Sequence, residues 1–464
     1  MILNQYYLEC LSHASYLVAD AEAGEAIVVD PRRDVGIYLR DAAESGLRIV
    51  GIINTHLHAD FVAGHLELAA ATGAWIGLGY RAEVDYPFRP LRHGETVDVG
   101  EVRLDVLETP GHTWESISLL VRHTHDGGSQ AVLTGDALFV GDVGRPDLAA
   151  EVGADPDELA RALRRSLHEV LLALPDEVRV LPAHGAGSLC GKNLSPERES
   201  TIGIQRQSNP ALRPMPEAEF VRMITTGQPS VPEYFAYDAA LNRSSHALLN
   251  EEPHPVRLSA AEAARMLREG TKLLDARSPS RFARGHLPGS VNVGINGRFA
   301  ETAGMIVTPD DSVVVVVDAD RAAEAVVRLG RIGCDNVAGW IDPATEDFAS
   351  KATQEGRRVA AEDLDQEKAR RGPVLLDVRN VGELEVGALA GSVNIPLAEL
   401  PRRLGELPSS RPIIAYCTSG RRSSVAASIL RTTGFWRAAD ISDLAGGYKA
   451  WSALHPAGIT AAGR

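Results

Sequence analysis

The chain has 464 residues, of which 44% are hydrophobic and 23% are charged. This is the composition of a folded globular protein, it excludes a mainly disordered chain, and the length predicts two to four domains. Lys and Arg number 47 against 62 Asp and Glu, which gives a net charge of −15. A field this acidic repels phosphate backbones, so we expect no nucleic-acid partner.

Cysteine usage and hydropathy indicate the compartment. Four scattered cysteines, at positions 10, 190, 334 and 417, fit neither a disulfide scaffold nor a structural zinc site. The first residues lack the basic stretch and apolar run of a signal peptide, and the longest apolar runs are too short to span a bilayer. We therefore expect a cytoplasmic protein with free thiols and no membrane association.

Residues 1–245 combine short β-rich segments with one long helix. The expected strands are at residues 15–19, 26–30, 48–54, 102–107, 117–121 and 131–134. A helix is predicted over 155–174, with Asp155 as the N-cap and Pro156 at the first helical position. The pattern predicts an α/β domain over residues 1–245 whose first half is rich in strands.

The remainder of the chain is duplicated. LDAR at 274–277 recurs as LDVR at 376–379, and GSVN at 289–292 recurs at 391–394; 376 − 274 and 391 − 289 are both 102. One offset for two blocks predicts two copies of a full domain, at 256–355 and 359–464. In each copy an expected strand (313–317; 413–416) leads into a helix (322–330; 423–433, closed by Gly434), which indicates parallel-sheet α/β domains.

Histidine and aspartate follow predicted strands in four clusters of the first domain. The clusters are THLHADF at 55–61 with His56, His58 and Asp60, TPGHT at 109–113 with His112, TGD at 134–136 with Asp136, and PAHG at 182–185 with His184. Because each cluster comes just after a strand, all four can meet at one edge of a sheet. Imidazole and carboxylate groups suit a first-row divalent metal, so the sequence predicts a metal site.

These motifs resemble the metallo-β-lactamase superfamily over residues 1–240, whose first motif is HxHxDH. The resemblance implies an αββα sandwich. Phe61 stands where the last motif histidine would be. In binuclear hydrolases of the superfamily that histidine holds the second metal, and phenylalanine cannot ligate, so Phe61 argues against two-metal hydrolysis.

A mononuclear site with two histidines and a carboxylate resembles the persulfide dioxygenase branch, as do TGDAL at 134–138 and GRPD at 144–147. The resemblance implies one Fe(II) per chain on His56, His112 and Asp136. His58 and Asp60 would orient ligands or bound water, with His58 as an alternative ligand. His184 would either help to hold substrate or serve the structure.

Cys190 is a candidate accessory thiol because it follows His184 by only six residues. Its flanking glycines indicate a loop, and Lys192 is expected to favour the thiolate. The alternative is a small buried hydrophobic residue, as most free cysteines are.

The last domain carries a second candidate site. Cys417 ends the strand at 413–416, and Thr418, Ser419, Gly420, Arg421 and Arg422 lead into the helix. Backbone N–H groups, the helix N-terminus and two guanidinium groups there would favour a thiolate or persulfide anion. The loop resembles the CxxGxR loop of rhodaneses, and the resemblance, over 359–455, implies that Cys417 carries sulfane sulfur.

The first copy keeps the GHLPG segment at 285–289 but has no CxxGxR loop. Asp318 stands where the thiol is expected, and a carboxylate cannot carry a persulfide sulfur. We therefore expect residues 256–355 to be an inactive rhodanese-like domain that serves as a spacer or docking surface.

The combined hypothesis is a persulfide dioxygenase fused to a thiosulfate sulfurtransferase, acting in sulfide detoxification as a homo-oligomer. Its expected substrates are O₂ and a low-molecular-weight persulfide of glutathione, coenzyme A or a similar thiol, with sulfite and thiosulfate as partners of the transfer step in either direction. One alternative is a zinc thioester hydrolase of the glyoxalase II kind fused to a sulfurtransferase. The other, ranked last, is a sulfide-responsive regulator or sulfur-relay scaffold.

Overall fold

The computed structural model describes residues 1–124, 129–148 and 153–455. The last nine residues of the predicted 359–464 domain lie outside this range. The chain divides into two compact units: Met1–Gln228, Phe235–Glu251 and Gly330–Gly333 form the first, and Pro229–Tyr234, Glu252–Leu329 and Cys334–Arg464 form the second. The predicted boundaries at residues 245, 256, 355 and 359 stay predictions.

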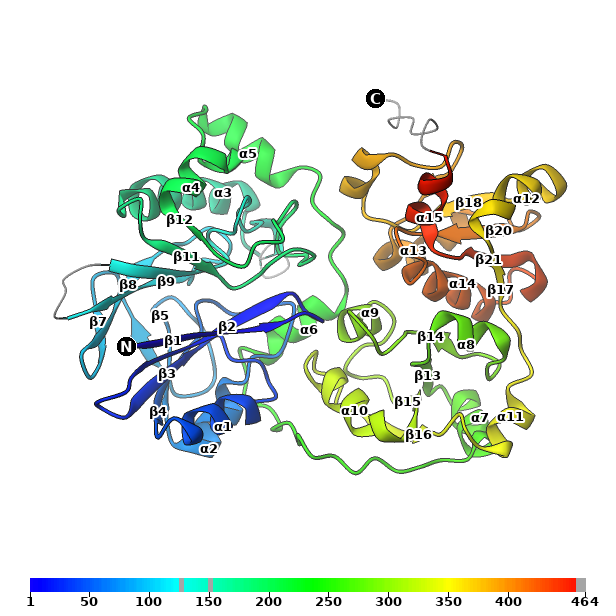
Figure 1. The fold of residues 1–464 in the computed structure, drawn as a ribbon, viewed down its shortest axis with the longest axis horizontal. Coiled ribbons are helices and arrows are strands. Elements are labelled where there is room, and N and C mark those ends of the chain that lie inside the picture. Colours follow the sequence, from blue (N-terminus) through cyan, green and yellow to red (C-terminus); the bar gives the residue numbers. More distant parts are fainter. Residues whose placement is uncertain (125–128, 149–152, 456–464) are drawn as a thin grey trace. The chain divides into compact units, whose positions relative to one another are not determined.

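The first unit contains two six-stranded sheets (Figure 1). The first sheet follows chain order, with β1 (Ile2–Leu8), β2 (His13–Asp20), β3 (Glu25–Val29), β4 (Arg48–Ile53), β5 (Trp75–Gly79) and β6 (Arg89–Leu91). The second sheet has the order β12-β11-β10-β9-β8-β7, with β7 (Thr96–Val99), β8 (Val102–Glu108), β9 (Ile117–His123), β10 (Ser129–Gly135), β11 (Arg179–Pro182) and β12 (Ser200–Thr201).

The two sheets pack face to face. In β8 the side chains of Val102, Leu104 and Val106 alternate with more exposed residues and enter the core between the sheets, as the period of two in a strand requires. All of β2 is buried because its other face is covered as well. The layers therefore run helix, sheet, sheet, helix.

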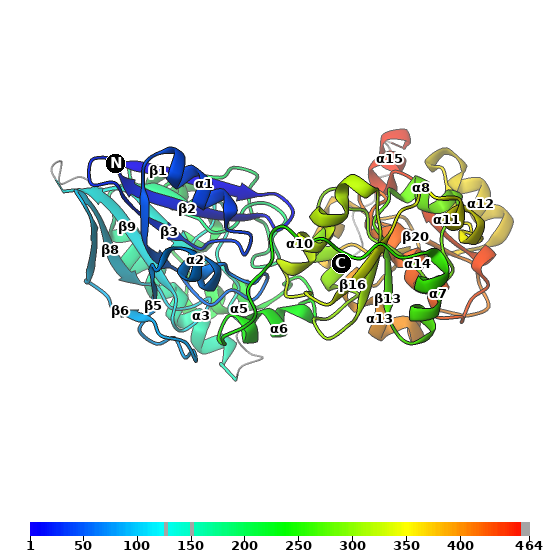
Figure 2. The ribbon, with the colours of Figure 1, turned by 90° about the horizontal axis from the view of Figure 1, so that it is seen from below.

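Helices cover the two outer faces. Those of the first unit are α1 (Gly36–Glu44), α2 (His65–Thr72), α3 (Pro156–Arg165), α4 (Ile202–Ser208), α5 (Glu217–Thr225) and α6 (Tyr234–Leu241). Residues of α1 and α2 pack on the first sheet, and residues of α3, α4 and α5 pack on the second. Figure 2, which views the molecule from below, has α1 and α2 in front of the first sheet.

The second unit contains two parallel sheets. The four-stranded sheet has the order β14-β13-β15-β16, with β13 (Lys272–Asp275), β14 (Val291–Asn292), β15 (Val313–Val316) and β16 (Val337–Ile341). The five-stranded sheet has the order β17-β21-β20-β18-β19, with β17 (Arg357–Val359), β18 (Val374–Asp377), β19 (Val393–Asn394), β20 (Ile413–Tyr416) and β21 (Ile441–Leu444).

Helices alternate with these strands. They are α7 (Ala260–Arg268), α8 (Pro279–Arg284), α9 (Phe299–Gly304), α10 (Ala322–Gly330), α11 (Glu346–Lys351), α12 (Leu364–Arg371), α13 (Leu400–Arg403), α14 (Arg422–Thr432) and α15 (Gly447–Leu454). Within the described residues, no helix has the length and apolarity that crossing a membrane would require.

The predicted fold class, an αββα sandwich followed by parallel-sheet α/β domains, is confirmed. Asp155 caps α3 by accepting from the N–H of Asp157, as predicted. The helix predicted over 155–174 is confirmed as a helical segment, but only its first part, α3, is α-helical: a π-helical turn (Ser166–Val170) and a 3₁₀ turn (Leu171–Ala173) follow directly. Gly434 has φ +71° and follows the C-cap residue Thr433.

Candidate metal centre and candidate thiol site

The side chains of His56, His112 and Asp136 converge where β4, β8 and β10 end. The Asp136 Oδ2 atom lies 3.8 Å from His56 Nε2 and 3.5 Å from His112 Nε2. One candidate ligand atom from each residue lies within 4.8 Å of the others, and all three residues are buried. The structure therefore brings the predicted triad together.

Hydrogen bonds at the Nδ1 atoms of His56 and His112 fix the orientation of the two imidazole rings. The Thr55 hydroxyl donates to Asp30 Oδ2 (2.9 Å), so it accepts from His56 Nδ1 at 3.0 Å. The carbonyl oxygen of Arg145 accepts from His112 Nδ1 at 2.8 Å. Each histidine thus keeps Nε2 free of a proton and directs it towards Asp136, which is the arrangement that metal-ligating histidines need.

The triad fits a divalent metal ion. Burial, followed by repulsion from His58 and His112, holds the pKa of His56 well below its ordinary value, so this ring is the neutral ligand form. Both carboxylate oxygens of Asp136 are buried and accept no hydrogen bond of ordinary geometry among the described residues. A buried carboxylate without donors is costly unless a cation compensates it, so the donor set suits a metal.

His58 turns away from the triad. Its Nε2 atom lies 2.9 Å from Asp30 Oδ1, and burial by itself lowers the pKa of His58, but the Asp30 carboxylate outweighs burial and raises it. The sequence reasoning missed Asp30, which also accepts from the backbone N–H of Thr55 and has a φ of +50°. The signal was available in the sequence as an aspartate at the end of the strand expected at residues 26–30, since the metal motifs also follow strands.

Phe61 is fully buried beside His58, with 4.4 Å between the ring centroids. The ring of His13 lies 4.1 Å from Phe61 and also faces His58 and His184. Burial holds the pKa of His13 well below its ordinary value, so this ring is neutral. His13 is a second residue that the sequence reasoning missed, because it lies outside every motif.

Asp60 and His184 form a second group with His58, next to the triad. His184 donates from Nδ1 to the carbonyl oxygen of Ser12 (3.2 Å), and its Nε2 lies 3.5 Å from Asp60 and 3.7 Å from Asp136. His58, Asp60 and His184 therefore lie beside the triad, and their roles in orienting ligands or holding substrate stay predictions.

Cys190 lies close enough to Asp136 and His184 to form a third group of candidate ligand atoms. The reason for expecting a thiolate was wrong: burial, then the carboxylates of Asp60 and Asp136, raise the pKa of Cys190 well above its ordinary value. Lys192 does not offset them, since its ammonium group is directed to the carbonyl oxygen of Thr226.

Arg145 is buried and connects His112 to the loop that carries Cys190. Its guanidinium group pairs with Asp147 and donates to the carbonyl oxygen of Leu189, while its backbone N–H donates to the carbonyl oxygen of Cys190. One residue thus orients His112 and holds the Cys190 loop.

Cys417 is buried where β20 ends. The backbone N–H of Gly420 donates to its sulfur at 3.2 Å, and the Ser423 hydroxyl lies 3.8 Å from the same atom. Gly447 and Tyr448 close the loop from behind: a Cβ on Gly447 would lie 2.2 Å from the Cys417 carbonyl oxygen, which accepts from the N–H of Tyr448. The loop therefore presents a thiol in a polar, tightly packed backbone turn.

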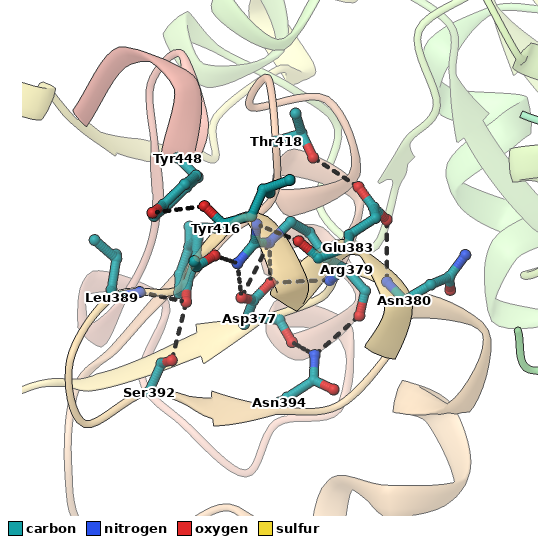
Figure 3. A network of polar contacts seen from close by, with 12 residues as sticks. Asp377, Arg379, Asn380, Glu383, Leu389, Ser392, Asn394, Tyr416, Thr418 and Tyr448 are labelled. Atoms are coloured by element: carbon teal, nitrogen blue, oxygen red, sulfur yellow. Dashed lines mark hydrogen bonds and ion pairs between the residues drawn. The ribbon is translucent and has the colours of Figure 1, made fainter. Parts of the chain in front are cut away.

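The two loop arginines differ. Arg422 makes a two-pronged ion pair with Glu383, at 2.6 and 2.7 Å, and Thr418 donates to the same carboxylate (Figure 3 shows the Thr418 bond). Among the described residues, no hydrogen bond or ion pair involves the exposed guanidinium group of Arg421. Arg422 thus fixes the loop, whereas Arg421 is available to an anion; Glu383 was not foreseen from the sequence.

The first copy has no thiol at the matching position, but the predicted equivalence was off by one residue. Asp275 pairs in register with Val316, and Asp377 pairs with Tyr416. Val317 therefore matches Cys417, and Asp318 matches Thr418. The error arose because β15 ends at Val316 rather than at 317.

Comparisons with known proteins agree with this geometry. Residues 8–184 match the Metallo-beta-lactamase superfamily, and residues 259–344 and 360–454 match the Rhodanese-like domain. A solved metallo-beta-lactamase from Staphylococcus aureus subsp. aureus COL is 32% identical with a TM-score of 0.67, and the match covers 74% of this chain and 99% of that one.

Two curated relatives match the first half of the chain. The mitochondrial persulfide dioxygenase ETHE1 of Bos taurus is 29% identical over 230 residues, which are 48% of this chain and 80% of the relative. A hydroxyacylglutathione hydrolase of Polaromonas sp. is 34% identical over 173 residues, 37% of this chain, and the chain spans 61% of that relative's length. The chain therefore belongs to the metallo-β-lactamase superfamily, with an ETHE1-like domain followed by two rhodanese-like domains.

Proposed function

We propose that this chain is a persulfide dioxygenase coupled to a thiosulfate sulfurtransferase. The first site would hold one Fe(II) per chain and oxidise a low-molecular-weight persulfide to sulfite. The second would move sulfane sulfur between a persulfide and sulfite, forming or using thiosulfate, in sulfide detoxification. The enzyme class is supported by the ETHE1 relatives and by the two rhodanese-like matches.

One observation carries the oxidative half: three donor atoms converge while the position of a further metal ligand is taken by a buried phenylalanine. His56, His112 and Asp136 supply two imidazoles and one carboxylate, which is the donor set of non-haem Fe(II) oxygenases. Phe61 is packed against His58 and offers no ligand atom. This favours a mononuclear site over the two-metal site of a hydrolase.

The overall oxidation converts a persulfide, O₂ and water into a thiol, sulfite and two protons. A bound Fe(II) supplies the redox chemistry with O₂ that protein side chains lack. The protein's own part is to orient His56 and His112 through Thr55 and the Arg145 carbonyl group, and to keep His56 neutral by burial. Cys190 is a candidate accessory thiol beside this site, and its burial raises the pKa of the thiol.

In the transfer half, Cys417 would attack the outer sulfur of a donor and carry it as a persulfide. The N–H of Gly420 would hold the sulfur anion. Arg422 holds the loop through Glu383, and Arg421 is free to attract an anionic donor or acceptor.

The test is anaerobic purification and metal analysis, followed by O₂ uptake with a synthetic persulfide. One iron per chain is expected. Asp136→Ala should abolish O₂ uptake and leave thiosulfate-to-cyanide sulfur transfer intact, and Cys417→Ser should do the reverse, so each variant controls the other. O₂ uptake that survives Asp136→Ala would refute the assignment.

A zinc thioester hydrolase remains the second candidate, because the hydroxyacylglutathione hydrolase of Polaromonas sp. is 34% identical to the matched segment. The same preparation decides between the two. Zinc in place of iron, no O₂ uptake and hydrolysis of a glutathione thioester would establish the hydrolase.

A further inference from the structure

Helix α14, which begins where the Cys417 loop ends, is held by hydrogen bonds to the first rhodanese-like repeat, the one without a thiol at the position of Cys417. The Ser424 hydroxyl donates to Asn292 Oδ1 at 2.7 Å, and the backbone N–H of Asn292 donates to the Ser428 hydroxyl at 3.0 Å. All these groups are buried, and α14 contacts β14. Two polar links one helical turn apart therefore fix the rotation of α14 on the neighbouring repeat.

The same repeat lies against the free arginine of the loop. A Cβ atom on Gly297 would lie only 2.5 Å from Arg421 Nη1, so the guanidinium group rests on the backbone there. Arg328 holds this backbone by donating to the carbonyl oxygens of Ile295 and Gly297, both at 2.5 Å. Arg321 donates to the side chain of Asn296 in the same segment. The surface behind Arg421 is therefore braced by two buried or half-buried arginines.

The arginine at this position has a different partner in the two repeats. In the first, Arg321 makes a two-pronged ion pair with Glu324 at 2.7 Å. In the second, the matching residues are Arg421 and Ser424. Ser424 is uncharged, and its hydroxyl donates a hydrogen bond to Asn292. The substitution of serine for glutamate leaves the positive charge of Arg421 uncompensated, as an anion-binding residue requires.

We propose that the first rhodanese-like repeat, although it has no thiol at the position of Cys417, is a working part of the sulfurtransferase site, in which the 295–297 segment positions Arg421 to bind a sulfur oxyanion and Asn292 fixes α14. This inference rests on the proposed transfer function of Cys417. In the step it serves, the sulfite sulfur attacks the outer sulfur of the Cys417 persulfide. The bond to Cys417 breaks, its electron pair returns to Cys417 as a thiolate, and thiosulfate leaves without any net oxidation or reduction.

Gly297→Asn in the full chain tests the oxyanion subsite. Asparagine tolerates the φ of +81° at this position better than other side chains, and its bulk would displace the Arg421 guanidinium. We expect the KM for thiosulfate, measured with cyanide as acceptor, to rise about tenfold while kcat stays within about twofold. O₂ uptake with a persulfide should not change.

The matched control is Gly391→Asn, because Gly391 has a φ of +77° and open space around it. Its KM should stay at the wild-type value. Arg421→Ala should raise the KM, and adding Gly297→Asn to Arg421→Ala should raise it no further. A KM unchanged by Gly297→Asn, or one that rises as much in Gly391→Asn, would overturn the inference.

Ser424→Ala tests the clamp by an independent measurement. Removing the link to Asn292 should slow alkylation of Cys417 by iodoacetamide about threefold, because α14 would carry Gly420 and Ser423 away from the sulfur. Thr432→Ala is the control on the same helix, since the hydroxyl of Thr432 donates to the carbonyl oxygen of Ile429 within its own helix and has no side-chain bond to the first repeat among the residues that the structure describes. Equal rates in the two variants would refute the clamp. If wild type transfers no sulfur, or Cys417→Ser still does, the proposed function fails instead.

Discussion

The two rhodanese-like repeats contain the same buried ion-pair network, which we call the frame: an aspartate at the end of a strand, and the arginine two residues later that binds it. In the first, Arg277 binds Asp275 through Nε and Nη2 and also donates to the carbonyl oxygen of Gly285. In the second, Arg379 binds Asp377 through the same atoms and donates to the carbonyl oxygen of Gly387 (Figure 3). The closest contact is 2.6 Å in both pairs.

The loops next to this frame differ between the repeats in their ion pair and in the residue at the thiol position. In the first repeat Arg281 pairs with Asp318 on the exposed surface, and Val317 holds the thiol position. In the second, the matching residues are Glu383 and Thr418, and Glu383 binds Arg422 beside the buried Cys417. The frame therefore serves the fold in both repeats, whereas sulfur transfer depends on a few loop residues. Those loop residues can be lost without loss of the fold.

The largest expected effect comes from breaking the frame, and it should be equal in the two repeats. Arg277→Leu and Arg379→Leu each leave a buried aspartate without its partner, which costs about 3–5 kcal/mol in the free energy of unfolding. Because the chain has several domains, hydrogen exchange measured by mass spectrometry should follow β13 and β18 separately. Protection that falls in only one repeat would show that the frames are not equivalent.

The loop ion pair of the second repeat should matter less to stability and more to activity. Burial opposes ionisation of Glu383, but the ion pair with Arg422 outweighs it and lowers the pKa of Glu383 to about 2. The carboxylate therefore stabilises the fold above its ordinary pKa of about 4.3, and this contribution fades as the pH falls towards 2. Glu383→Gln should lower the free energy of unfolding by about 1–2 kcal/mol at neutral pH, a figure that already allows for the partial exposure of the ion pair. It should lower the rate of sulfur transfer about tenfold.

The measurement is the melting temperature between about pH 6 and about pH 3, alongside the transfer rate. The difference between wild type and Glu383→Gln should shrink as the pH falls, because wild type loses the charge that the variant never had. Asp318→Asn is the matched control in the first repeat. Its ion pair with Arg281 is exposed on both sides, so the change should cost under about 1 kcal/mol and leave transfer intact.

Local patterns in the sequence predicted most of the frame. Buried parallel strands such as Val313–Val316 have apolar side chains on both faces, and the repeated LDxR and GSVN blocks contain the Asp, Arg and Asn residues of the network. The four metal motifs were equally accessible, since each follows a strand, whereas the choice of His56, His112 and Asp136 among them came from the resemblance to persulfide dioxygenases.

The missed residues act over long sequence distances. His13 reaches Phe61 and His184 only through the pairing of separate segments, and Asn292 meets Ser424 across 132 residues. Neither belongs to a motif. The off-by-one match of Asp318 has a local cause: a strand end is set by hydrogen bonding to its neighbours, and Val317 is as apolar as the strand before it.

The smallest expected effect is the most direct test of the separation between frame and loop. Val317→Cys in a Cys417→Ser background places a thiol at the matching strand end of the first repeat. The change is close in volume, so the fold should lose at most about 1 kcal/mol. Transfer should nevertheless stay at the Cys417→Ser level, because Asp318, which is paired with Arg281, follows the new thiol where a sulfur-binding turn is needed. Recovery of more than about a tenth of wild-type transfer would show that the thiol alone, and not the loop from Thr418 to Arg422, separates the active repeat from the inactive one.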